Sequence, residues 1–248
     1  MNSVGLIGFG RFGKILSSIL QKGFSVKVHD LNHNQDFGNI EFVSINKVLQ
    51  EDTIFIAVPI RNFEKVIKKI SVSINKKTTL LDVCSVKTFP IKTMEKLLPK
   101  SIGYIGTHPM FGPDSFLINE SLKMVMHRSN DIYKQFDFWK RFFSDQNIHI
   151  IEMNPGKHDR LAAQTQGVTH FLGRMLKNYG IKKTSIDTQG FTDLLDLVDQ
   201  TCNDSWDLYT DLQSYNPFTE DMISKLKNST NELDKQLREL KDYELENK

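Results

Sequence analysis

The fold is decided by the stretch Val4-Gly5-Leu6-Ile7-Gly8-Phe9-Gly10-Arg11-Phe12-Gly13, a short apolar run that ends in a G-x-G-x-x-G motif. Residues 14–20 then place apolar side chains on one helical face, so the motif lies between a predicted strand and a predicted helix. In this context Gly8 permits the tight turn, Gly10 lets the backbone approach a pyrophosphate, and Gly13 lets the helix pack on the strand. The N-terminus of the helix offers free N–H groups to an anion. Residues Gly8, Phe9, Gly10, Arg11, Phe12 and Gly13 therefore predict a dinucleotide site, and a glycine turn without a ligand is the alternative.

An acid follows the next predicted strand. Asp30 lies about 20 residues after Gly8, where a carboxylate accepts hydrogen bonds from both ribose hydroxyls of a dinucleotide. The same carboxylate would repel the 2′-phosphate of NADP, so Asp30 favours NAD over NADP as the cofactor, although His29 and His33 nearby oppose this inference. An acid that merely caps a turn is the alternative interpretation.

Strand and helix patterns alternate up to about residue 153. Further strands are predicted at residues 24–29, 53–58, 79–83, 103–107, 123–127 and 148–152, with helices at 63–70 and 131–143. This alternation is typical of an α/β fold, a Rossmann-type doubly wound and mostly parallel sheet, over residues 1–153. Ligands of such sheets bind beyond the carboxyl ends of the strands, where Val58 and Pro59 are further candidates for cofactor binding.

The second part of the chain, residues 154–248, shows helical patterns alone. Helices are predicted at residues 157–178, 191–203, 205–215 and 219–245, which indicates an all-helical domain. Apolar residues recur at steps of three and four along the last helix, at Ile223, Leu226, Leu233, Leu237 and Leu240, with Thr230 in the same series. This helix either caps its own domain or forms the interface of a dimer.

Composition excludes several classes of partner. Hydrophobic residues make up 39% and charged residues 25% of the chain, as in ordinary globular proteins, and the net charge of +2 gives no strong attraction for nucleic acid or an anionic membrane. Cys84 and Cys202 are too few for a disulfide framework and lack the spacing of a metal site. Neither a secretory signal nor a transmembrane run is recognisable. We therefore expect a cytoplasmic protein, or a mature form that lacks its targeting segment, with a small-molecule ligand and no metal.

Two further motifs each follow a predicted strand: Asp82-Val83-Cys84-Ser85-Val86-Lys87 and Thr107-His108-Pro109-Met110-Phe111-Gly112-Pro113. They resemble the signature segments of the prephenate and arogenate dehydrogenases. The resemblance continues through His158-Asp159 and Thr169-His170-Phe171-Leu172-Gly173-Arg174, and from Gly190 to Trp206 it is closest to plant-type arogenate dehydrogenases. It implies oxidative decarboxylation of arogenate to tyrosine with hydride transfer to a nicotinamide cofactor, and a homodimer formed through the helical domain.

The resemblance also implies catalytic residues. His108 would be the base, and an imidazole whose pKa is near neutrality suits proton removal from a ring hydroxyl. Ser85 would hydrogen-bond either this imidazole or the ring hydroxyl. The role of Lys87 stays open, a solvated strand end being the alternative.

Substrate-binding residues follow from the same resemblance. Gln166, His170 and Thr188 fall where family members contact the substrate, and Asp204 would face the ammonium group that arogenate has and prephenate lacks. A surface acid or an N-cap near Ser205 is the alternative for Asp204. The bacterial enzymes imply an Arg near Asp196 for a substrate carboxylate, and the sequence has none there.

Three other functions compete with arogenate oxidation. Prephenate could be the substrate, giving 4-hydroxyphenylpyruvate. A hydroxyacid or imine dehydrogenase shares the architecture, but the motif at residues 107–113 does not belong to those groups. A protein of another class, a catalytically inactive NAD-binding regulator, could keep the fold, although Ser85 and His108 argue against it.

Overall fold

The computed structural model describes residues 2–32, 40–112, 116 and 121–246. The chain divides into two compact units, Met1–Asp159 and Arg160–Lys248, whereas the sequence placed the boundary at residue 153. His33 and Pro113 lie outside the described residues.

The first unit is built on one sheet, whose strands in the described residues follow the order β3-β2-β1-β4-β5-β6-β7-β8. The strands are β1 (Ser3–Ile7), β2 (Ser25–His29), β3 (Glu41–Phe42), β4 (Thr53–Ile56), β5 (Thr79–Asp82), β6 (Gly103–Pro109), β7 (Leu122–Asn130) and β8 (Ile148–Glu152). All neighbouring pairs are parallel except β6 and β7. The order reverses between β1 and β4, so the switch point of a doubly wound sheet lies there. The predicted α/β class is confirmed.

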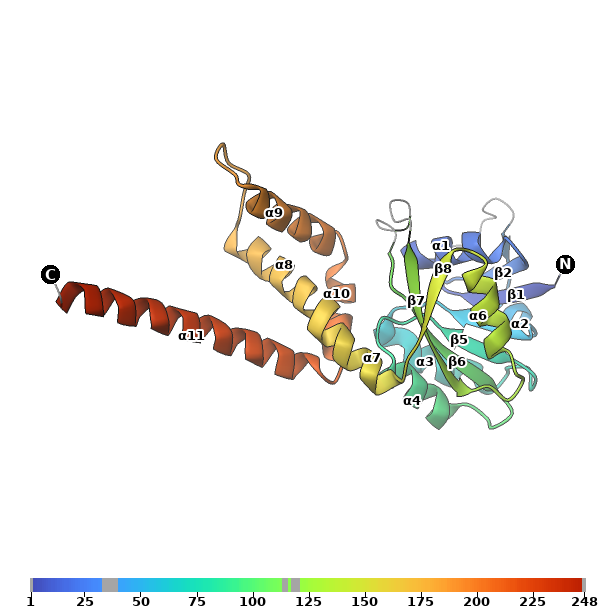
Figure 1. Ribbon diagram of the computed structural model, residues 1–248. Helices are drawn as coiled ribbons and strands as arrows, with labels where there is room; N and C mark the ends of the chain where they lie inside the picture. Colours follow the sequence, from blue (N-terminus) through green and yellow to red (C-terminus); the bar gives the residue numbers. More distant parts are fainter. Residues whose placement is uncertain (1, 33–39, 113–115, 117–120, 247–248) are drawn as a thin grey trace. The chain divides into compact units, whose positions relative to one another are not determined.

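Helices connect these strands (Figure 1). They are α1 (Arg11–Leu20), α2 (Ile45–Val48), α3 (Ile60–Ile70), α4 (Thr88–Leu97) and α6 (Phe136–Ser144). Helix α6 begins five residues later than its pattern predicted, because a carboxyl oxygen of Asp131 accepts from the N–H groups of Gln135 and Phe136 at 2.6 and 3.2 Å and so ends the preceding turn. The sequence pattern missed β3, α2 and α4.

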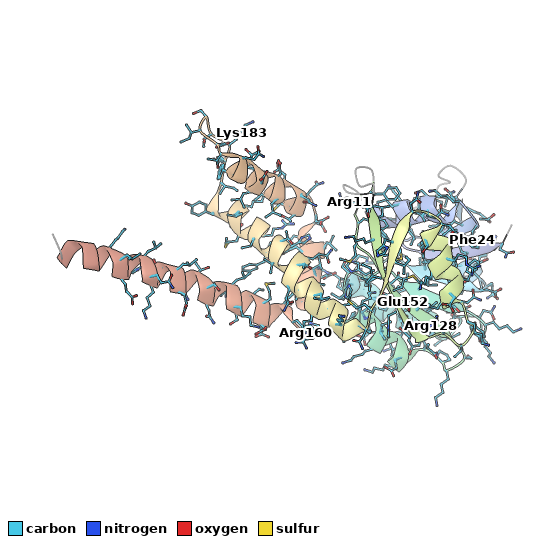
Figure 2. All side chains as sticks on the ribbon, viewed as in Figure 1. Arg11, Phe24, Arg128, Glu152, Arg160 and Lys183 are labelled. Carbon is cyan, nitrogen blue, oxygen red and sulfur yellow. The ribbon has the colours of Figure 1, made fainter. Side chains whose placement is uncertain are left out.

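Aromatic side chains anchor α6 on the sheet. Trp139 is fully buried, with its ring centroid 4.9 Å from that of Phe55 on β4 in an edge-to-face arrangement. Phe24, which precedes β2 and is labelled in Figure 2, has its ring centroid 5.2 Å from those of both Trp139 and Phe142 of α6. Such rings remove large apolar areas from water and fix the helix on the sheet.

The second unit consists of helices in the part of the chain that is described. Helix α7 (Pro155–Ala162) starts in the first unit and continues through a π-helical turn (Ala163–Gly167) into α8 (Val168–Tyr179). The other helices are α9 (Gln189–Cys202), α10 (Trp206–Ser214) and α11 (Thr219–Glu246). Helices α8 and α9 lie side by side, and Gly173 makes this possible because a Cβ there would collide with Thr201. None of the helices described here is long and apolar enough to span a membrane.

Helix α11 extends beyond α8, α9 and α10 within its own unit (Figure 1). Its side chains Leu233, Leu237 and Leu240 are 61%, 62% and 60% exposed. This part of the helix does not cap its own unit, so that alternative fails for the C-terminal half of the apolar series.

Candidate active site

The glycine-rich loop between β1 and α1 has the shape of a phosphate cradle. Gly8 has a φ of +100°, and a Cβ there would collide with the carbonyl oxygen of Ala57 at the end of β4. A Cβ on Gly10 would meet nothing within 4 Å, so the space above it is open. Gly10 is also the N-cap of α1 and has no side chain to accept the first N–H groups of the helix. These features fit a dinucleotide pyrophosphate.

Asp30 directly follows β2 and is bound to this loop. One carboxyl oxygen accepts from the backbone N–H of Phe9 at 2.6 Å, and the other accepts from Asn32 at 2.8 Å. The Phe9 ring is buried and packs edge-to-face on Phe42. Phe9 therefore shapes the loop from the core side. Each carboxyl oxygen of Asp30 can accept more than one hydrogen bond, so the residue can still serve a ribose hydroxyl.

The remaining predicted residues of the first unit lie at the same edge of the sheet. Val58 and Pro59 follow β4, Ser85 follows β5, and His108 is near the end of β6. Because β1, β4, β5 and β6 are parallel, their carboxyl ends share one edge. The structure thus brings together the predicted cofactor residues and the predicted base.

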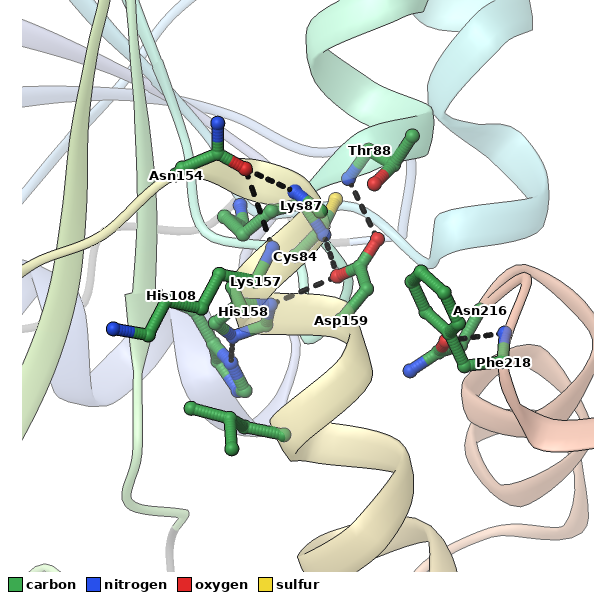
Figure 3. A network of polar contacts seen from close by, with 12 residues as sticks. Cys84, Lys87, Thr88, His108, Asn154, Lys157, His158, Asp159, Asn216 and Phe218 are labelled. Atoms are coloured by element: carbon green, nitrogen blue, oxygen red, sulfur yellow. Dashed lines mark hydrogen bonds and ion pairs between the residues drawn. The ribbon is translucent and has the colours of Figure 1, made fainter. Parts of the chain in front are cut away.

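His108 has a partner that the sequence interpretation did not assign. Its Nδ1 lies 2.8 Å from Nε2 of His158 on α7, and both rings are buried (Figure 3). Nδ1 of His158 in turn lies 2.8 Å from a carboxyl oxygen of Asp159. In the sequence, His158-Asp159 was recognised only as part of the family resemblance. Its contact with His108 depends on the fold, which brings α7 to β6.

Asp159 is held by the start of α4. Its Oδ1 accepts from the backbone N–H of Lys87 at 2.7 Å, and its Oδ2 accepts from that of Thr88 at 2.8 Å. A carboxylate is favoured at a helix N-terminus, where N–H groups point at it. The pKa of Asp159 lies below its ordinary value: burial opposes this shift, but hydrogen bonds from His158, Thr88 and Lys87 outweigh burial. Asp159 is therefore a fixed anion next to His158.

This chain of contacts sets the proton positions when both imidazoles are neutral. His158 donates from Nδ1 to the Asp159 carboxylate, which leaves its Nε2 as an acceptor. Nδ1 of His108 must then donate to that atom. The free lone pair of His108 is consequently on Nε2, as a general base requires.

The environment keeps His108 neutral. Burial lowers its pKa well below the usual 6.5, and the neighbouring His158 and Lys87 lower it further. The neutral form of the His108 imidazole is therefore favoured.

Lys87 is a buried cation and not a solvated strand end. Its side chain is 0% exposed, and Nζ donates to the Asp82 carboxylate and, at 2.5 Å, to the carbonyl oxygen of Thr107. Thr107 also donates from Oγ1 to the carbonyl oxygen of Asp82 at 2.5 Å. These bonds join β5 to β6 immediately before His108, so they fix the backbone that carries its imidazole.

Ser85 is partly buried at this edge, but the partner of the His108 Nδ1 atom is His158. Hydrogen bonding of Ser85 to the imidazole is therefore not seen at this atom. Its hydrogen bond to the ring hydroxyl of a substrate stays a prediction.

The second unit holds the predicted substrate residues. Gln166 and His170 lie one turn apart on one helical face, and Arg174, which the sequence interpretation did not select, continues that face. Arg174 donates from Nη2 to the carbonyl oxygen of Asp204 at 2.5 Å. His170 is within electrostatic range of both Asp204 and Arg174, and burial lowers its pKa.

Thr188 and Ser205 are helix N-caps, which bears on the roles predicted for Thr188 and Asp204. Thr188 is exposed and caps α9, where its Oγ1 accepts from the N–H of Phe191 at 3.4 Å. Ser205 caps α10 by accepting from Leu208 at 3.2 Å, so the N-cap alternative for Asp204 does not hold.

Comparison with known proteins gives matches along the chain. The model of the prephenate dehydrogenase nucleotide-binding domain matches residues 23–132, and that of the TYRAAT1-like C-terminal domain matches residues 175–248. Chloroplastic arogenate dehydrogenase 2 of Arabidopsis thaliana is 32% identical over 90% of this chain and 66% of its own length. A probable arogenate/prephenate dehydrogenase of Methanocaldococcus jannaschii is 30% identical over 86% of this chain and 51% of its own length.

Solved structures show the same fold. Prephenate dehydrogenase from Aquifex aeolicus superposes with a TM-score of 0.76 at 22% identity, covering 99% of this chain and 95% of that one. Synechocystis arogenate dehydrogenase gives a TM-score of 0.68 at 17% identity, covering 98% of this chain and 93% of that one.

The sheet order and the glycine-rich loop place the chain among the proteins with a Rossmann-type nucleotide-binding domain followed by a helical unit. Within that class, the chain belongs to the prephenate/arogenate dehydrogenase family. It spans 66%, 36% and 51% of the lengths of three curated relatives that it matches.

Proposed function

We propose that the protein catalyses the oxidative decarboxylation of arogenate to tyrosine with a nicotinamide cofactor. The observation that carries this proposal is the buried series His108, His158 and Asp159, which leaves Nε2 of His108 free as a base at the sheet edge that also carries the glycine-rich loop. Membership in the family supplies the reaction class.

In this reaction His108 takes the proton of the ring hydroxyl on Nε2 as the carbon that bears the hydroxyl loses a hydride. A nicotinamide bound at the glycine-rich loop would supply the hydride acceptor. The ring carboxylate then leaves as carbon dioxide, and its bonding electrons complete the aromatic ring. His108 can return its proton to the phenolate oxygen, so protons and electrons balance.

The rest of the chain supports the base. When His108 has taken up the proton, its Nδ1–H still donates to His158, and Asp159 still holds that second ring, so the imidazole keeps its orientation. Lys87, Asp82 and Thr107 hold the preceding backbone, so the imidazole does not need to be reoriented for each turnover.

Gly8, Gly10 and Gly13, the start of α1 and the neighbouring Val58 and Pro59 would hold the cofactor. Asp30 supports NAD, because a carboxylate beside the ribose disfavours a 2′-phosphate. Two relatives from yeasts are named as NADP(+)-dependent prephenate dehydrogenases, so NADP is the second candidate.

Arogenate is preferred over prephenate because of Asp204, which is partly buried next to His170 and Arg174. A carboxylate here attracts the ammonium group of arogenate, whereas the keto oxygen of prephenate offers it no donor. Prephenate oxidation to 4-hydroxyphenylpyruvate is the second candidate function.

One steady-state experiment tests these assignments. Purified protein is assayed with arogenate and with prephenate, each with NAD and with NADP, for wild type and for Asp204→Asn. We expect the highest kcat/KM with arogenate and NAD. In Asp204→Asn, kcat/KM should fall roughly 10-fold or more for arogenate and should not fall for prephenate. An equal preference for arogenate in both proteins would show that Asp204 does not select the substrate. Tight NAD binding without turnover of either substrate would favour the inactive regulator.

We also propose a homodimer formed through the helical unit. The exposed leucines Leu233, Leu237 and Leu240 support it, because they follow the spacing of a helix–helix seam and have no cover in their own unit.

A further inference from the structure

Three side chains on one face of the second unit each have a buried polar atom without a hydrogen-bond partner. They are Oε1 of Gln166, Nδ1 of His170 and Nε of Arg174, within the part of the chain that the structure describes. The residues are four positions apart, so the three atoms form a line along the helix. Buried polar atoms without partners are rare in folded proteins, and a line of them indicates a ligand that completes their hydrogen bonds.

The Arg174 guanidinium is held in place by several neighbouring groups. Its Nη2 is bound to the carbonyl oxygen of Asp204, and its guanidinium carbon lies 5.7 and 5.4 Å from the ring centroids of Trp206 and Tyr209. The group is thus fixed by one hydrogen bond and two aromatic rings before any ligand binds. Its Nε–H remains for another acceptor.

The chemistry of the missing acceptor can be inferred. A guanidinium whose Nε–H is unpaired binds a carboxylate well, because the fork of N–H groups matches the two carboxylate oxygens. The charges of Asp204 and Arg174 both act on His170, so Asp204 contributes a negative charge to the same region, which disfavours a dianion such as phosphate. A ligand that carries both a carboxylate and an ammonium group satisfies both residues.

We propose that Arg174 binds the side-chain carboxylate of the substrate while Asp204 binds the adjacent ammonium group. This inference rests on the proposed function and assigns a residue to a task for which the sequence held no candidate near Asp196. Arg174 then sets affinity for the amino-acid end of arogenate and for the keto-acid end of prephenate. Asp204 distinguishes between the two.

The test measures binding as well as turnover. Three probes are used: L-tyrosine has both charged groups, 3-(4-hydroxyphenyl)propionate has the carboxylate alone, and tyramine has the ammonium alone. Their dissociation constants are measured by calorimetry with NAD present. The variants are Arg174→Met, which removes the charge and keeps the length, and Arg174→Lys, which keeps the charge without the fork. Lys177→Met is the control, because it removes an exposed cation from the same helix.

Arg174→Met should weaken the binding of L-tyrosine and of the propionate roughly 10- to 100-fold, and that of tyramine less than about 2-fold. The dissociation constants of Arg174→Lys should lie between those of Arg174→Met and wild type. Those of Lys177→Met should match wild type. In turnover, Arg174→Met should raise KM for arogenate and for prephenate alike, with KM for NAD unchanged.

Equal weakening of all three probes would show a structural role for Arg174 and overturn the inference, as would unchanged binding of both acids. Failure of the proposed function looks different: wild type itself would turn over neither substrate.

Discussion

Nδ1 of His108 and Nε2 of His158 lie 2.8 Å apart, and both imidazoles are buried. One ring belongs to strand β6 and the other to helix α7, so tertiary packing creates the pair. Because Asp159 holds Nδ1 of His158, the pair leaves Nε2 of His108 unprotonated when both rings are neutral. His158 is thus a positioning residue for the base.

Replacing His158 should change both the rate and its pH dependence. His158→Phe leaves Nδ1 of His108 without an acceptor, and we expect kcat to fall about 10- to 100-fold. His158 also lowers the pKa of His108, so the pKa should rise in the variant. A base must be unprotonated to act, so the acid limb of kcat/KM against pH should move to higher pH.

His149→Asn is the control for this measurement, since His149 is an exposed histidine on β8. If kcat/KM of His158→Phe fell by the same factor at every pH, without displacement of the acid limb, the role of the His158 ring would be purely structural.

The base itself is tested by His108→Asn. The amide cannot accept the hydroxyl proton effectively, so kcat should fall about 10²- to 10⁴-fold. The glycine-rich loop is untouched, so the dissociation constant for NAD, measured by fluorescence titration, should stay within about 2-fold of wild type. A fully active variant would overturn the assignment.

The sequence alone predicted those parts of the fold that depend on local patterns. The strand, glycine loop and helix around Gly8 follow from residue order, and short runs with apolar residues predict the strands that carry Asp82 and His108. Helix α4 was missed because the N–H groups of Lys87 and Thr88 at its start are satisfied by Asp159, far along the chain. Contacts between distant parts of the chain also explain why the boundary between the units lies later than residue 153. His158 and Asp159 belong to the first unit, although the helical pattern starts before them.

The candidate site divides in the same way. His108 and Ser85 belong to recognisable motifs, whereas the roles of His158, Lys87 and Arg174 depend on the partners that folding brings to them. A lysine at a strand end is usually solvated, and only the buried Asp82 beside it makes Lys87 a structural cation.

The Lys87–Asp82 pair should be needed for stability. Lys87→Met leaves Asp82 buried without its cation, and we expect a loss of about 3–5 kcal/mol in the free energy of unfolding at neutral pH. Burial already raises the pKa of Asp82, and Lys87 opposes that shift. In the variant the pKa should rise further, so the carboxyl is neutral at low pH and the loss should shrink as pH falls.

Urea unfolding at about pH 5 and pH 8 measures this difference. The double variant Lys87→Met, Asp82→Leu is the control, because it removes both charges and should be less destabilised at pH 8 than the single variant. Equal losses in the two proteins at both pH values would mean that charge burial is not the cause.

Asp30 should control the choice of cofactor. Asp30→Asn keeps an acceptor for the N–H of Phe9 but removes the charge that repels a 2′-phosphate. We expect the ratio of kcat/KM for NAD to that for NADP to fall roughly 10-fold, mainly because NADP binds better. Glu64→Gln, an exposed position on α3, is the control for a change in net charge. An unchanged ratio would indicate that residues other than Asp30 select the cofactor.

The apolar face of α11 should determine the oligomeric state. Leu233, Leu237 and Leu240 are each about three-fifths exposed, and burying them against a second copy removes apolar area from water that the single chain leaves exposed. Changing all three to Ser should convert a dimer into a monomer in analytical ultracentrifugation and leave the helical content largely unchanged. Val72→Ser removes another highly exposed apolar side chain, in the first unit, and should leave the dimer intact. If the triple variant sediments as wild type does, the seam on α11 is not what joins the subunits.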